Sequence, residues 1–144
     1  MGCKGVPSSV TALFQQLADQ HGFRVRPPRR TGAFEGLMQW AEGEHVSLVF
    51  VRDRGEEYIQ VWDGQRSWPP YLVQLVLTGA EVEDAPEDLE RDVSFLAGHI
   101  AEVERLFHPE HQAETIARLK ALGKKLRPFR FPPELFPEFF MDGD

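Results

Sequence analysis

The chain has 144 residues, a hydrophobic content of 42% and a formal net charge of −7. A domain of this length buries roughly two-thirds of its unfolded surface, and the apolar content excludes global disorder. The negative charge excludes general affinity for nucleic acid, because binding to a phosphate backbone needs clustered lysines and arginines. With the single Cys3, no secretory signal and no apolar run near the ~18 residues of a membrane span, we expect a cytoplasmic protein without membrane contact.

The N-terminal residues 1–7 are predicted to be flexible, and a helix follows them. Ser8 or Ser9 can cap this helix at its start, and Gly22 can end it in the left-handed conformation. Between these signals the apolar residues recur at helical spacing. They are Val10, Leu13, Phe14 and Leu17.

Strands are predicted for the next part of the chain. Residues 23–26 and 33–41 indicate two short strands, and residues 45–64 indicate a hairpin with its turn at 53–56. Apolar residues in this hairpin occupy both alternating sets of positions. Because side chains of a strand point to opposite faces with period two, both faces of the hairpin are expected to be covered. We therefore place the hairpin in the middle of a sheet, with helices over one face.

Helices are predicted for the C-terminal half. Trp68-Pro69-Pro70 indicates the start of a short helix, which Gly79 ends, since proline suits a first helical turn. An apolar stripe over residues 87–107 indicates a long helix. His108-Pro109 breaks it, and residues 110–122 indicate a last helix.

The tail, residues 128–144, mixes phenylalanines with prolines. Proline excludes long regular structure, and a tail this rich in aromatic residues is not expected to stay free. We predict an extended strap that covers the second face of the sheet or docks on a partner or a second copy. The whole chain then forms a single α+β domain over residues 1–144. Its antiparallel sheet of about four strands follows the N-terminal helix and is packed by C-terminal helices.

No catalytic, metal or cofactor motif is complete in this sequence. The closest is His108-Pro109-Glu110-His111, but zinc-binding helices place two histidines four residues apart, whereas these are three apart with a proline between them. A third ligand would have to come from a distant part of the chain. Nucleophile elbows and phosphate-binding glycine loops are absent. We therefore expect no catalytic residue, no metal and no cofactor.

Charge is segregated along the chain. Residues 81–114 hold eleven acidic and two basic residues, and residues 118–130 hold six basic and no acidic ones. This pattern favours either mutual attraction of the two C-terminal helices or a bipolar surface that selects a partner. If the charges form a partner-selecting surface, the acidic residues would attract the partner as it approaches, and exposed aromatic residues would anchor it. The predicted binding residues are Trp68, Tyr71, Asp84, Glu87 and Asp88.

Two features of this chain are similar to those of known proteins. They are the hairpin at 45–64 with its Asp-Arg-Gly-Glu turn and the long helix ending at Leu106-Phe107-His108-Pro109. Together they resemble small uncharacterised bacterial α+β proteins, some of which are similar to immunity proteins of polymorphic toxin systems. The resemblance implies a small acidic protein that blocks a toxin by binding it. Interface residues of such proteins vary, so none is carried over to this chain.

From these observations we predict a non-enzymatic protein-binding module, an immunity-type inhibitor of a basic protein partner. Two alternatives stay open. The first is a small-ligand-binding protein or enzyme with a pocket between sheet and helices, lined by Trp40, Tyr58, Trp62 and a histidine. The second is a structural or chaperone-like homodimer formed through residues 128–144.

Overall fold

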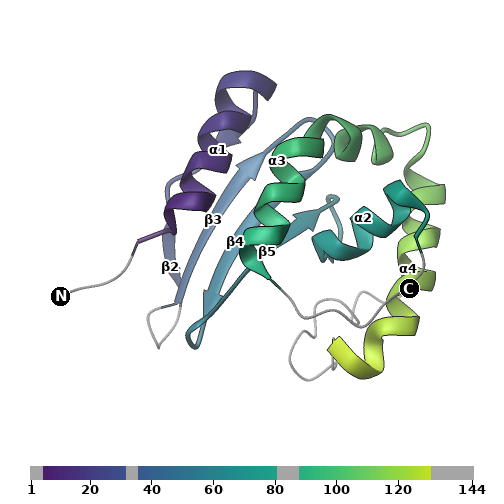
Figure 1. Ribbon diagram of the computed structural model, residues 1–144. Coiled ribbons are helices and arrows are strands. Elements are labelled where there is room, and N and C mark those ends of the chain that lie inside the picture. Colours follow the sequence, from purple (N-terminus) through teal and green to yellow (C-terminus); the bar gives the residue numbers. More distant parts are fainter. Residues whose placement is uncertain (1–4, 32–35, 81–87, 131–144) are drawn as a thin grey trace.

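The computed structural model describes residues 5–31, 36–80 and 88–130. The α+β class is confirmed, and the antiparallel sheet has six strands where about four were expected (Figure 1). The additional strands, β2 and β6, are three and two residues long, too short to show a period-two pattern. In chain order the elements are α1 (Ser8–His21), β1 (Arg24–Val25), β2 (Arg29–Thr31), β3 (Gly36–Glu42), β4 (Ser47–Asp53), β5 (Glu56–Trp62), β6 (Ser67–Trp68), α2 (Pro70–Thr78), α3 (Leu89–Leu106) and α4 (Gln112–Arg130).

The predicted hairpin, β4–β5, is confirmed at the centre of the sheet, whose strand order is β1-β3-β4-β5-β6. Asp53 pairs with Glu56, so only two residues form the turn. Arg54 and Gly55 both have positive φ, 56° and 85°, which is the backbone of a type I′ turn. This turn fixes the register that places Phe50 opposite Ile59.

Strands β1 and β2 pair with the same side of β3. Arg24 lies opposite Glu42, and Arg29 lies opposite Met38. Residues 27–28, both proline, separate the two strands. The result is one interrupted edge strand, rich in arginine.

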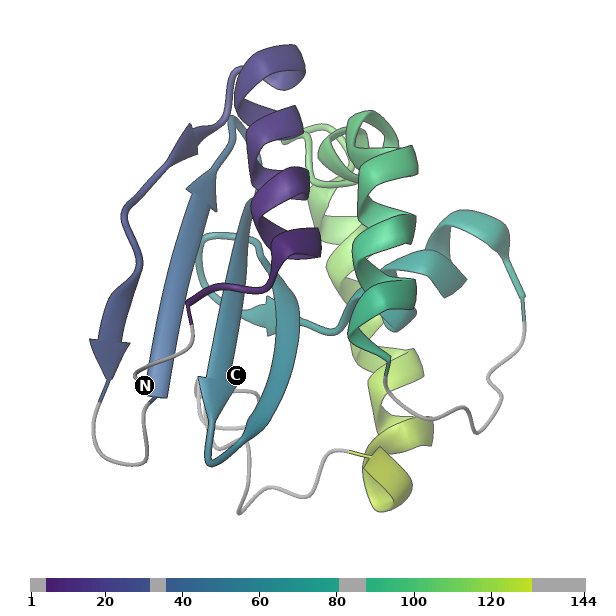
Figure 2. The ribbon, with the colours of Figure 1, turned by 60° about the vertical axis from the view of Figure 1, so that its left-hand side comes forward.

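Helices α1, α2 and α3 lie on one side of the sheet (Figure 2). Between them and the sheet lies the apolar core, in which each large side chain contributes about 2 kcal/mol by burial. Its fully buried large members are Phe14, Phe50, Phe107, Leu13, Leu17, Leu48, Ile59, Leu96, Ile100, Leu119 and Val10. The apolar stripes predicted for the first and the long helix therefore face this core.

Helix α1 ends as predicted, with Gly22 at φ 72° donating its N–H to Leu17. Its predicted start is wrong in detail, because Pro7 precedes the helix and no side chain caps it. Ser9 lies inside the helix and donates to Glu90 at the start of α3 (2.8 Å). This hydrogen bond links two helices that are adjacent in Figure 1.

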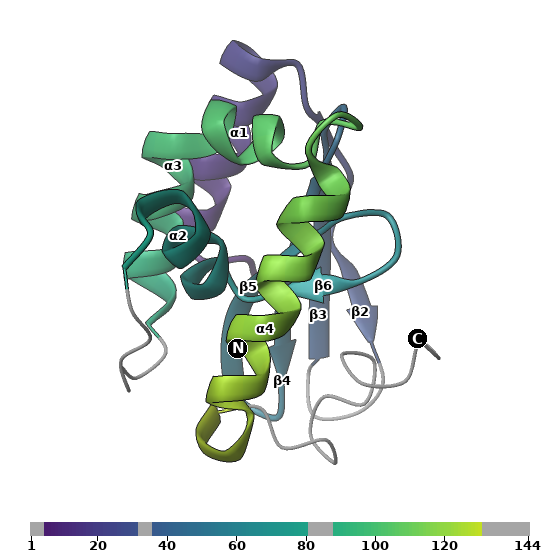
Figure 3. The ribbon, with the colours of Figure 1, turned by 90° about the vertical axis from the view of Figure 1, so that its right-hand side faces the viewer.

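Helix α4 packs against α2 beside the β6 edge (Figure 3). It does not stop at residue 122, because Gly123 has no positive φ and continues the helix to Arg130. Glycine inside a helix costs only about 1 kcal/mol relative to alanine. The predicted extended strap is therefore wrong for residues 128–130, and its remainder, residues 131–144, lies outside the described residues.

Candidate functional site

The face of the sheet opposite α1, α2 and α3, here called the second face, gathers aromatic and basic side chains. Among the described residues, no helix lies over this face (Figures 2 and 3). Strand register defines its members, because residues paired across strands share a face. They are Arg24, Arg26, Arg29, Thr31, Gly36, Met38, Trp40, Glu42, Ser47, Val49, Val51, Asp53, Glu56, Tyr58, Gln60, Trp62 and Ser67.

A tryptophan pair forms the centre of the second face. The rings of Trp40 on β3 and Trp62 on β5 meet edge to face, with centroids 5.9 Å apart and planes at 88°. Between them on β4 lies Val49, which is only 3% exposed. Both indoles are half-buried, so each keeps part of its ring accessible.

Next to this pair, Gln60 is a buried polar residue with incomplete hydrogen bonding. It is 4% exposed, and its Nε2 donates to the carbonyl of Ile59 (3.2 Å). Its Oε1 has no donor within the part of the chain that the structure describes. A buried acceptor of this kind costs free energy unless a donor reaches it.

A cavity of about 520 Å³ lies at the β1–β2 side of the second face. Of the described residues, those that line it are Arg26, Pro27, Arg29, Trp40 and Glu42. Arg26 is positioned firmly, because its N–H donates to Trp40 (2.9 Å) and its carbonyl accepts from Gln39 (2.8 Å). Its Nε lies 3.2 Å from the Glu42 carboxylate, and half of its side chain stays exposed. The cavity is therefore lined by both an indole ring and guanidinium groups.

Trp40, Tyr58 and Trp62 all lie on the second face. They therefore cannot line a pocket between the sheet and the helices, and that predicted location is wrong. Both alternating sets of β4 and β5 are apolar, as the sequence indicates, but the larger aromatic rings belong to the set that faces away from the helices.

Trp68 was expected to be an exposed anchor, and this expectation is wrong. The residue pairs with Val61 on the core side of the sheet and is 7% exposed. Its indole N–H donates to the Asp63 carboxylate (2.8 Å), whose other oxygen accepts the backbone N–H groups of Gln65 and Arg66. Asp63 thereby folds the β5–β6 turn over the indole and buries it.

The other predicted binding residues have different positions. Tyr71 on α2 is half-buried, and the Arg91 guanidinium lies over its ring at 5.6 Å. Asp88 is exposed and caps α3 by accepting the N–H of Arg91 (3.1 Å). Asp84 and Glu87 lie outside the described residues. A role in binding stays a prediction for all four.

A second cluster of ionisable groups lies where α3 meets the β3–β4 turn. The carboxylate of Glu104 accepts the backbone N–H groups of His45 (3.1 Å) and Val46 (3.3 Å). Burial raises the pKa of Glu104, and these two N–H groups and the nearby His45 ring offset part of that rise. A Cβ built on Gly43 would overlap this carboxylate and the Phe23 ring, so only glycine permits the approach.

A row of three histidine rings begins beside this carboxylate. His45 Nε2 lies 3.9 Å from a carboxylate oxygen of Glu44. The rings of His45 and His108 are 5.0 Å apart, and His111 lies beyond His108 at 6.3 Å. One ligand atom each from Glu44, His45 and Glu104 lie within 4.8 Å of one another. Sequence reasoning considered His108 and His111 but missed this group, because no spacing rule joins residue 45 to residue 104.

No protein-family model matches the chain, and neither the curated proteins nor the solved structures include a significant match to it. In the ranges that the structure describes, every helix is too short or too polar to cross a membrane.

Proposed function

We propose that the protein is a non-enzymatic protein-binding module and that its second face recognises an acidic, extended segment of a partner. The supporting observation is the cavity beside Trp40, which combines an apolar wall with arginines from one edge of the sheet. An apolar side chain of the partner would enter the cavity, and neighbouring carboxylates would meet the guanidinium groups.

Charge supports an acidic partner for this face. Arg24, Arg26 and Arg29 are all exposed, and the acid on β3 that borders them is Glu42. A guanidinium group binds a carboxylate through two parallel hydrogen bonds, which gives direction as well as strength. Because the whole chain carries −7, a local basic row also orients the approach of an acidic segment.

Aromatic packing supports a protein partner. Trp40 and Trp62 are large and partly exposed, and tryptophan and arginine are the residues that most often dominate binding energy at protein interfaces. Strand addition at the β1–β2 edge is a weaker alternative, since two prolines and several arginines protect that edge.

The predicted inhibitor of a basic partner depends mainly on the acidic residues 81–92. Of these, 81–87 lie outside the described residues. Asp88 and Glu90 are engaged within the chain, as the cap of α3 and as the acceptor of Ser9. An immunity-type role therefore stays a prediction, and a toxin-like reading frame beside the gene would be the direct support for it.

The test is a quantitative pull-down from native lysate with the Arg26→Glu/Arg29→Glu variant beside the wild-type chain. We expect the wild type to retain an acidic protein and the variant to lose it, because two attractive charges become repulsive. Arg118→Glu on α4 is the matched control, since it is an exposed arginine away from the second face. Retention of the same proteins by the double variant, or recovery of small metabolites alone, would refute the proposal.

A further inference from the structure

We infer that Glu44, His45 and Glu104 form a binding site for a divalent transition-metal ion, with Zn²⁺ as the best fit. This inference is independent of the second face and of its partner. The three residues come from the β3–β4 turn and from the end of α3, which are far apart in the sequence and adjacent in the fold.

The three candidate ligand atoms are gathered within reach of a single ion. One imidazole nitrogen and two carboxylate oxygens lie within 4.8 Å of one another. Around zinc, with bonds of about 2.0–2.2 Å in a tetrahedron, such atoms lie roughly 3.4 Å apart. Closing the remaining distance needs movement of Glu44, whose side chain is 84% exposed and turns without a packing penalty.

Two parts of the site are already held in place. Glu104 is fixed by the N–H groups of His45 and Val46, and the turn is closed by the N–H of Gly43 donating to Val46 (2.8 Å). Each carboxylate oxygen has a second lone pair, so these hydrogen bonds leave Glu104 able to coordinate an ion. A preorganised ligand with its orientation set by hydrogen bonds is typical of metal sites.

The ligand types select among metal ions. Magnesium and calcium prefer sites made entirely of oxygen, whereas an imidazole favours zinc and its neighbours in the first transition row. Three protein ligands leave one tetrahedral position for water or for a group of a partner. A divalent cation would also neutralise the negative charges of the two carboxylates. One of these, Glu104, is partly buried and has a raised pKa.

His108 borders the site but is not a ligand in this arrangement. Its Nδ1 accepts the backbone N–H of Glu110 (3.1 Å), so in the neutral ring the proton is on Nε2. Neither nitrogen then offers a free lone pair to a metal. His108 instead packs edge to face against His45 and limits the rotation of that ring.

The test is titration of the full chain with Zn²⁺ by calorimetry, and with Co²⁺ by visible absorption, which reports tetrahedral coordination. We expect one saturable site, and we expect His45→Ala and Glu44→Gln each to weaken it by at least about tenfold. Glu44 is exposed, so Glu44→Gln tests the site even if a variant of Glu104 fails to fold. His108→Ala should change the affinity much less than His45→Ala.

His99→Ala is the matched control. His99 on α3 also contacts a carboxylate, Glu102 (2.7 Å), but lies outside the group of three ligands. Zinc binding by His99→Ala should therefore equal that of the wild type, and Mg²⁺ should give no saturable signal. The inference is wrong if the wild type shows no saturable zinc binding, or if His45→Ala binds zinc as tightly as the wild type.

Discussion

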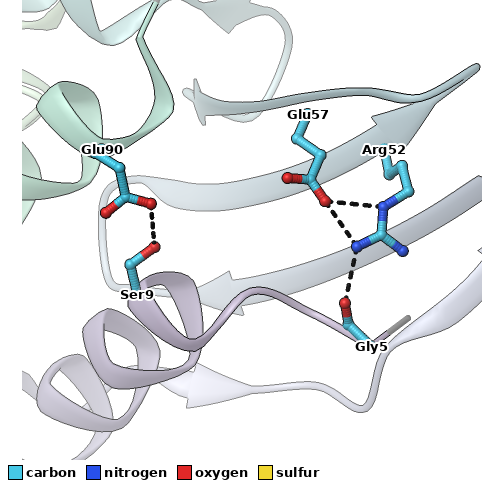
Figure 4. Close-up of polar contacts among 5 residues, drawn as sticks. All are labelled: Gly5, Ser9, Arg52, Glu57 and Glu90. Atoms are coloured by element: carbon cyan, nitrogen blue, oxygen red, sulfur yellow. Dashed lines mark hydrogen bonds and ion pairs between the residues drawn. The ribbon is translucent and has the colours of Figure 1, made fainter.

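Arg52 on β4 donates two hydrogen bonds, from Nε and Nη2, to one carboxylate oxygen of Glu57 on β5, at 2.9 and 2.7 Å (Figure 4). The same Nη2 donates to the carbonyl of Gly5 at 2.8 Å. Arg52 is 7% exposed and lies on the core side of the sheet. A single guanidinium group therefore ties the segment before α1 to the central hairpin.

We expect Glu57→Ala to lower the free energy of unfolding by about 2 kcal/mol. The substitution removes the carboxylate that accepts two hydrogen bonds from the buried Arg52 guanidinium group. Breaking a buried ion pair costs several kcal/mol in a dry site, and less here because the Glu57 side chain is 31% exposed. Urea unfolding measures the effect. Glu56→Ala at the exposed turn is the control and should change the value by less than about 0.5 kcal/mol. Equal midpoints for the two variants would show that the Arg52–Glu57 pair does not stabilise the fold.

We expect Asp63→Ala to cost about 2–3 kcal/mol. Its carboxylate accepts three N–H groups, and one of them, the Trp68 indole N–H, is buried and would lose its acceptor. Thermal unfolding followed by tryptophan fluorescence measures both the stability and the exposure of the indole. Gln65→Ala in the same turn removes an exposed side chain and should leave the melting temperature nearly unchanged. A melting temperature for Asp63→Ala equal to that of Gln65→Ala would contradict this account of the β5–β6 turn.

Replacing glycine by alanine is expected to have opposite effects on stability at Gly43 and at Gly98. Gly43→Ala should destabilise the protein, because the added methyl group overlaps Glu104 and Phe23. Gly98→Ala on α3 should stabilise it by up to about 1 kcal/mol, since the site is exposed, open and helical. Chemical denaturation of the two variants gives the comparison directly. A stabilising Gly43→Ala would mean that the β3–β4 turn does not pack on α3 as described.

Local signals in the sequence predicted much of this fold. Gly22 and Gly79 end their helices with positive φ, and the two-residue turn at Arg54 and Gly55 fixes the central hairpin. These features depend on backbone preferences within a few residues, so a short window contains the information. The end of α4 was missed because Gly123 resembles a stop signal, although its backbone remains helical.

The candidate sites depend on tertiary neighbours and could not be predicted in the same way. From the sequence alone, Trp68 is expected to be exposed, because it comes just before a helix. Its pairing with Val61 instead places it on the core side of the sheet. Arg26 and Arg29 line a cavity with Trp40 only because β1 and β2 both pair with β3. Nothing in the local sequence of residue 104 indicates that its carboxylate closes a turn at residue 45.

Trp40→Ala and Tyr71→Ala distinguish the second face from the interface predicted by sequence. Trp40 lines the cavity on the second face, whereas Tyr71 lies on α2 beside Arg91. We expect Trp40→Ala to weaken partner binding by at least about thirtyfold, the loss of one interface residue worth about 2 kcal/mol. Tyr71→Ala should leave the affinity unchanged.

The affinities are measured by calorimetry with the protein recovered in the pull-down. Circular dichroism on each variant must first show an unchanged fold, since both side chains are partly buried. Raising the salt from low to physiological concentration should weaken binding of the wild type, because salt screens the attraction between exposed charges. The reverse result, with Tyr71→Ala weakened and Trp40→Ala intact, would move the interface to α2 and the start of α3. In that case the partner would meet Asp88 and its acidic neighbour Glu90, as expected for a basic protein.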